Sequence, residues 1–171
     1  MSVKSTETPS ASLDVTRYLF TRQAWVAAGP AQVYELISTV SNIGKWSPNA
    51  IEARYDDGAG PVEGAWFSGR NRRAGNEWES RSRVTKAEPG VEFTYAVLGS
   101  VPVPIVEWRW TFRPHGSGTL TTLSWRLLEA DPVLGSTYEE LDQLRDATVG
   151  SVEATLASLA SWIADQPPAH R

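Results

Sequence analysis

A single stretch of this chain has the pattern of a long helix, and it comes last. Residues 136–165 carry apolar side chains at helical spacing. This inner stripe contains Leu141, Leu144, Thr148, Val152, Leu156, Leu159 and Ile163. Residues 51–129 before it are almost entirely β-type, with Gly or Pro in their connections. Because one helix has to cover one whole face of the sheet, we expect the sheet to curl around it and to leave a cavity between them.

Seven strands are expected, and their short connections favour an antiparallel meander over βαβ units. The first strand covers about residues 14–28, and Pro30 then begins a short helix. A second short helix is expected near residues 40–45. The other strands are predicted at 51–56, 65–72, 77–87, 91–98, 105–113 and 119–129. The predicted fold class is α+β.

The length of 171 residues suits one domain, which we place at residues 14–165. Residues 1–13 are rich in Ser and Thr, have no apolar core typical of a signal peptide, and are expected to be disordered. Residues 166–171 form a short tail. Apolar runs stay far below the roughly 20 residues that a membrane-spanning helix needs, so the cytoplasm is the expected location.

Composition excludes several kinds of chemistry. The chain has no Cys and two His, of which His115 lies in a Gly-rich turn and His170 in the tail. A metal centre and a Ser-His hydrolase are therefore not expected, and no cofactor is predicted. The net charge of −4 gives no electrostatic reason to bind nucleic acid.

Eight Trp in 171 residues are more than a small core usually needs. Surplus aromatic side chains often line ligand cavities, and the alternative is plain core packing. Strand alternation divides the side chains between two faces. Charged residues such as Glu77, Arg81, Glu107 and Arg109 fall on the outer face. The ligand-binding residues predicted on the inner side are Trp46, Phe67, Trp78, Ser80, Ser82, Phe93, Trp108, Trp110, Thr121, Leu123, Trp125, Thr148 and Val152.

Several motifs occur in a familiar order. They are Trp46-Ser47-Pro48, a GxxFxGxNR run from Gly64 to Arg72, Glu88-Pro89-Gly90, the alternating Trp108, Trp110 and Phe112, and Thr155-Leu156. Over residues 17–163 the sequence resembles the START-like, helix-grip superfamily (SRPBCC), in its polyketide cyclase/dehydrase-type branch. The resemblance implies a seven-stranded curved sheet around a long C-terminal helix and a cavity for an apolar ligand. Many relatives carry a Glu where Leu123 stands, so this cavity lacks that carboxylate.

Three functions are compatible with this interpretation, and the resemblance implies the first two. One is a cofactor-independent cyclisation or dehydration of a polyketide-like chain, which a carrier protein could deliver. The other is a non-catalytic carrier or sensor of an apolar metabolite, and an interaction module with an incidental cavity is a third alternative. Either a monomer or a homodimer is compatible with the sequence.

The candidate catalytic residues are Asn71, Tyr95 and Arg145. Asn71 and Tyr95 could polarise a carbonyl group of the ligand, although Asn71 could instead be satisfied by an internal partner. Arg145 lies at the edge of the helix stripe, where it could hold negative charge at the cavity mouth. The alternative for Arg145 is a surface ion pair with Asp142.

Overall fold

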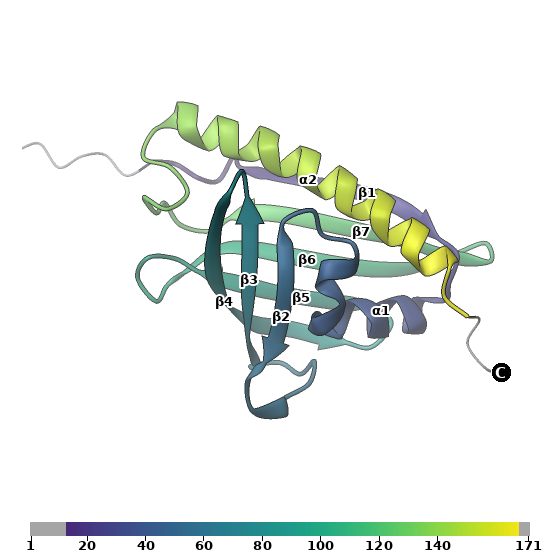
Figure 1. The fold of residues 1–171 in the computed structure, drawn as a ribbon. Coiled ribbons are helices and arrows are strands. Elements are labelled where there is room, and N and C mark those ends of the chain that lie inside the picture. Colours follow the sequence, from purple (N-terminus) through teal and green to yellow (C-terminus); the bar gives the residue numbers. More distant parts are fainter. Residues whose placement is uncertain (1–12, 168–171) are drawn as a thin grey trace, which may run out of the picture.

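The computed structural model describes residues 13–167 (Figure 1). Residues 1–12 of the expected disordered segment and residues 168–171 of the expected tail lie outside the described residues. The elements in chain order are β1 (Leu19–Val26), α1 (Pro30–Ser38), the 3-10 helix η1 (Val40–Lys45), β2 (Ala50–Tyr55), the 3-10 turn η2 (Asp56–Gly58), β3 (Trp66–Arg73), β4 (Asn76–Glu88), β5 (Glu92–Leu98), β6 (Pro104–His115), β7 (Gly118–Leu127) and α2 (Tyr138–Ala164).

All seven strands form one antiparallel sheet in the order β1-β7-β6-β5-β4-β3-β2. Consecutive strands pair from β2 to β7, and β1 joins the far side of β7. In Figure 1 the strands β2–β4 run steeply across the direction of β5–β7, which shows how strongly the sheet curls. The long helix α2 runs across the sheet beside β1 and β7. This arrangement confirms the predicted α+β helix-grip fold.

Strands β2–β7 agree with the predicted ranges to within two residues, but β1 begins five residues later than predicted. The cause is a local turn at Asp14. Its carboxylate accepts hydrogen bonds from the backbone N–H and the hydroxyl of Thr16, at 3.0 and 2.6 Å. Side-chain bonding of this kind offers the backbone an alternative to the sheet, and propensity alone does not reveal it.

The long helix α2 begins after a Thr cap. The Oγ1 of Thr137 accepts a hydrogen bond from the backbone N–H of Glu140, at 3.2 Å, and so satisfies one of the free donors of the first turn. Most of the predicted inner stripe is buried, from Leu141 to Ile163. Apolar burial of this stripe against the sheet, rather than helix propensity, stabilises the helix in place.

Aromatic side chains fill the end of the fold nearest to α1. The ring of Tyr34 packs edge-on against Phe93 and Phe112, with centroids 6.3 and 5.9 Å apart. Trp46 after η1 contacts Trp162 of α2 at 5.3 Å. At least two of the eight Trp, Trp46 and Trp162, therefore take part in core packing.

None of the helices within residues 13–167 is long and apolar enough to cross a lipid bilayer. The same residues contain no group of three or more His, Asp or Glu side chains placed to hold a metal ion.

Candidate ligand-binding cavity

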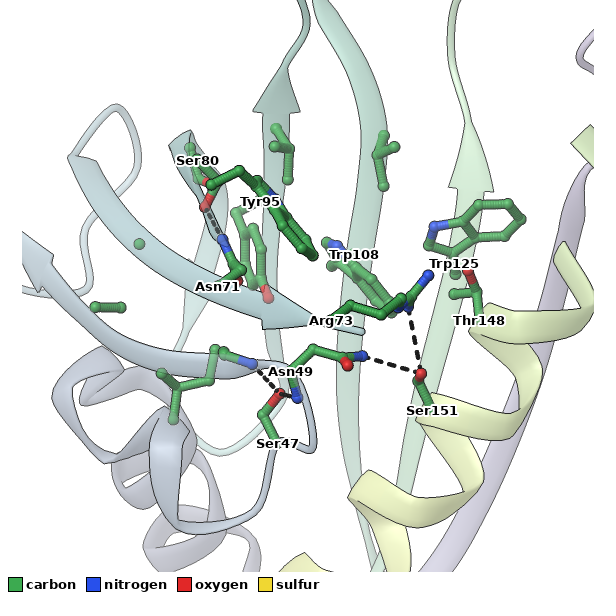
Figure 2. Close-up of a pocket in the computed structure, with 18 of the residues that line it drawn as sticks. Ser47, Asn49, Asn71, Arg73, Ser80, Tyr95, Trp108, Trp125, Thr148 and Ser151 are labelled. Carbon is green, nitrogen blue, oxygen red and sulfur yellow. Dashed lines mark hydrogen bonds between the residues drawn. The ribbon is translucent and has the colours of Figure 1, made fainter. Parts of the chain in front are cut away.

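A cavity of about 790 Å³ lies between the concave face of the sheet and α2. This volume falls in the range of small-molecule sites. Side chains from η1, from β2 to β7 and from α2 line it, so the curl of the sheet and the single covering helix together create the space. Figure 2 shows its polar and aromatic wall.

Most of the residues predicted to face inward do line this cavity. They are Asn71, Tyr95, Trp46, Phe67, Trp78, Ser80, Ser82, Phe93, Trp108, Trp110, Leu123, Trp125, Thr148 and Val152. On β6 the alternation holds as expected, because Trp110 and Phe112 are buried and Arg109 is exposed. Whether a ligand contacts each of these side chains stays a prediction.

Thr121 faces inward as predicted but does not line the cavity. It pairs with Phe112 on β6, whose ring lies against Tyr34 of α1. Alternation identifies the face of a strand, but it cannot tell which part of that face another element covers. The Oγ1 of Thr121 is buried and has no hydrogen-bond partner among the described residues.

Arg145 is also absent from the cavity wall. Its guanidinium lies 3.7 Å from the carboxylate of Asp142 and 3.3 Å from that of Asp146, and 5.8 Å from the ring centre of Tyr18. Of the two alternatives weighed for this residue, the structure shows the surface ion pair.

Asn71 and Ser80 form a polar pair on the cavity wall. The side-chain amide of Asn71 donates a 3.1 Å hydrogen bond to the Oγ of Ser80 (Figure 2). Gly69, which faces the cavity between Phe67 and Asn71, makes room for this bond. A Cβ at Gly69 would lie only 2.8 Å from the Oγ of Ser80. One donor of Asn71 and the hydroxyl proton of Ser80 remain free to meet a ligand.

Tyr95 contributes a neutral phenol. Its ring packs edge-on against Phe67 at 5.0 Å and tilted against Phe93 at 5.6 Å. Burial raises the pKa of its hydroxyl well above the ordinary value of 10.0. The group therefore stays protonated at physiological pH, so it can donate a hydrogen bond but cannot serve as a base.

A second polar cluster, made of Asn49, Arg73 and Ser151, escaped the sequence prediction although all three residues line the cavity. The Oγ of Ser151 on α2 accepts a hydrogen bond from the Nδ2 of Asn49 at 3.0 Å and from the Nη2 of Arg73 at 3.4 Å. In Figure 2 the Arg73 side chain extends from the end of β3 toward α2. The signal was present, because the alternation through Phe67 and Asn71 continues to Arg73.

Leu123, where many relatives carry a Glu, is 3% exposed and lines the cavity. Three carboxylates border the cavity: those of Glu52, Glu77 and Glu79. Their positions alternate with the inward-facing residues of β2 and β4, so they belong to the outer face. Glu52 and Glu77 are paired there with Arg70 and Arg72. The inner wall is thus mostly aromatic and neutral.

Comparison with solved structures supports the fold. The solution NMR structure of the polyketide-cyclase-like protein Cgl2372 from Corynebacterium glutamicum is 29% identical, with a TM-score of 0.63 over 90% of this chain and 98% of that chain. The crystal structure of the di-domain ARO/CYC protein StfQ, from the steffimycin biosynthetic pathway, is 14% identical, with a TM-score of 0.68 over 86% of this chain and 51% of that chain. The crystal structure of Ara h 8.0201 is 9% identical, with a TM-score of 0.66 over 86% of this chain and 98% of that chain.

None of the curated proteins matches the chain. A family profile does match it, over residues 18–163, and this range runs from the residue before β1 almost to the end of α2. The matched range contains every residue that lines the cavity. The chain belongs to the polyketide cyclase/dehydrase and lipid transport family.

Proposed function

We propose that the protein binds a flat or polycyclic, polyketide-like molecule in this cavity and promotes its cyclisation or dehydration. The observation that supports this most is the cavity of about 790 Å³, whose wall joins several Trp side chains to a few neutral polar groups. Such walls favour flat apolar ligands that are oriented by a small number of hydrogen bonds. The family and the likeness to ARO/CYC structures agree with this ligand class.

The chemistry would depend mainly on orientation. A flexible chain of ketones held in one folded shape brings its reacting carbons together, and the apolar wall keeps water away. The phenol of Tyr95 and the Asn71–Ser80 pair would donate hydrogen bonds to a carbonyl oxygen as it gains negative charge. These donors would stabilise the transition state more than the bound substrate.

A non-catalytic carrier is the second candidate. It is favoured by the absence of any His, and of any inward-facing Asp or Glu, from the described residues that line the cavity. A carrier needs the aromatic wall but no donor placed for a transition state. It would bind the same class of ligand and release it unchanged.

Turnover and affinity measured on one substrate decide between the two. For an oligoketide thioester of defined length, we expect Asn71→Leu and Tyr95→Phe each to lower product formation by about 10- to 1000-fold, the scale of losing one such donor. Affinity should change much less, because the aromatic wall supplies most of the binding. Wild-type protein that binds the thioester without forming product would favour the carrier.

Delivery by a carrier protein belongs to the same proposal, because poly-ketone chains cyclise spontaneously in water and direct transfer between proteins shortens their exposure to it. The thioester should then be turned over faster from an acyl carrier protein than as a free small-molecule thioester. Equal rates for the two forms of the thioester would show that the reaction does not depend on delivery by a carrier protein.

A further inference from the structure

Arg73 is a charged residue on the inner face of the sheet. It is the last residue of β3 and pairs with Asn76 across a two-residue turn, Ala74-Gly75. Both turn residues have positive φ, 50° and 81°, as a tight hairpin turn requires. Because the turn is this short, Arg73 remains inside the ladder, and its side chain lies on the same face as Asn71.

Neighbouring arginines on the outer face are paired with carboxylates. Arg72 donates two hydrogen bonds to Glu77, and Arg70 lies 3.5 Å from Glu52. Arg73 has no carboxylate within 4.0 Å among residues 13–167, and its one hydrogen bond is the 3.4 Å contact with the hydroxyl of Ser151. A guanidinium has five N–H donors, and Arg73 is a partly buried residue that lines the cavity, so most of its donors have no protein acceptor among the described residues.

Two neutral groups beside it complete a small site. The Nδ2 of Asn49 donates to the Oγ of Ser151, which leaves the hydroxyl proton of Ser151 and the second amide proton of Asn49 available. The backbone carbonyl of Asn49 also accepts the N–H of Arg72, at 2.7 Å, which ties the loop before β2 to β3. Three elements thus hold a cation and two donors at one place on the cavity wall.

We propose that Arg73, with Asn49 and Ser151, binds the carboxylate of a ligand whose apolar body occupies the aromatic part of the cavity. The inference rests on the proposed binding function and adds that the ligand is a monoanionic acid. The planar guanidinium fork matches the two oxygens of a carboxylate. A phosphate dianion suits the site less well, because a single cation faces it and the rim carries three carboxylates.

This placement also orients the ligand. The acidic group would lie between the β3–β4 hairpin and the middle of α2, and the apolar body would extend toward Trp108, Trp110 and Leu123. A neutral molecule of the same shape would leave the Arg73 donors unmet and would bind more weakly.

A matched pair of probes tests the proposal: 1-pyrenebutyric acid and its primary amide, titrated at pH 7 and low salt with pyrene fluorescence as the signal. We expect the wild-type protein to bind the acid about 10- to 100-fold more tightly than the amide, the scale of hydrogen bonds to a charged group. Arg73→Gln should lose this preference and keep the affinity for the amide. Arg73→Lys should keep part of the preference for the acid, since Lys retains the positive charge but lacks the planar pair of guanidinium donors.

Arg72→Gln is the control, because it removes an adjacent charge from the outer face and should leave the preference intact. Equal binding of acid and amide by the wild type, or an unchanged preference in Arg73→Gln, would overturn this inference and leave the proposed cavity function standing. A wild type that binds neither probe would count against the proposed function itself and would remove this inference with it.

Discussion

The side-chain amide of Asn71 donates a 3.1 Å hydrogen bond to the Oγ of Ser80 across the β3–β4 pair, directly on the cavity wall. An internal partner for Asn71 was one of the two possibilities that the sequence left open. It does not exclude a part in catalysis, because an amide has two donors and a hydroxyl can accept and donate together. The hydrogen bond instead couples the two side chains, so that a change at either residue affects the other.

The first prediction follows from this coupling between Asn71 and Ser80. We expect Asn71→Leu and Ser80→Ala each to lower turnover, and the double variant to lower it little more than the stronger single variant, because each change already breaks the same bond. Rates measured for all four proteins of the cycle test this. Gly69→Ala should mimic Ser80→Ala, since its Cβ would displace the Ser80 hydroxyl. Fully additive losses would mean that the two residues act separately.

Trp side chains on the two faces of the sheet should differ in their effect on binding. Trp108 lines the cavity, whereas Trp25 is 45% exposed on the outer face, with its indole N–H donating to the carbonyl of His115. We expect Trp108→Leu to weaken binding of 1-pyrenebutyric acid by about tenfold through lost apolar contact, and Trp25→Leu to leave it unchanged. Isothermal titration calorimetry on both variants gives the comparison. Similar losses in both would show that the probe binds elsewhere.

Much of this architecture was predictable, since the strands from β2 to β7 are rich in β-type residues and the connections between them carry Gly or Pro. What the sequence did not reveal depends on local hydrogen bonds and on neighbours distant in the chain. The late start of β1 follows from the side-chain turn at Asp14. Arg73 was missed because the Ala74-Gly75 turn is shorter than the loop that the sequence suggests, so the strand continues one residue further.

For the site, alternation indicates which side chains face inward but not what covers them. Thr121 faces the interior, yet α1 packs over that end of the sheet. Arg145 sits one residue past Leu144 on α2, and this step of about 100° around the helix turns it from the cavity toward Asp142 and Asp146. These outcomes depend on tertiary packing, which no local pattern contains.

Two buried threonines on β7 should respond in opposite directions to the same change. The Oγ1 of Thr121 has no partner among the described residues, whereas that of Thr119 donates to the backbone carbonyl of Ala28 at 2.6 Å. Thr121→Val replaces an unpaired hydroxyl with a methyl group of similar size, so we expect stabilisation of about 1 kcal/mol. Thr119→Val should destabilise by about 1–3 kcal/mol, because it leaves a buried carbonyl unpaired. Urea unfolding measures both, and a destabilised Thr121→Val protein would contradict the argument.

The last prediction concerns a carboxylate on the outer face of β5. Glu92 is 7% exposed, and its oxygens accept hydrogen bonds from the Oγ1 of Thr94 at 2.7 Å and from the Nη2 of Arg109 at 3.1 Å. The Nζ of Lys86 lies 3.6 Å away. Burial by itself raises the pKa of this carboxyl group, but the two hydrogen bonds and the two positive charges outweigh it, so the pKa lies below the ordinary value of 4.5.

A carboxyl group with a lower pKa in the folded state stabilises the protein above its unfolded pKa, and this contribution is lost as the pH falls through the folded value. We therefore expect Glu92→Gln to lower the free energy of unfolding by about 1 kcal/mol at pH 7, a modest figure because Arg109 and Lys86 are half-exposed. The difference from wild type should stay constant from pH 7 down to about pH 5 and shrink below about pH 4. Glu88→Gln, which removes an exposed partner of Lys86, should change stability by less than about 0.5 kcal/mol throughout. Urea unfolding of the three proteins across this pH range tests the assignment, and a Glu92→Gln difference that persists undiminished at pH 3 would show that packing, not charge, accounts for the effect.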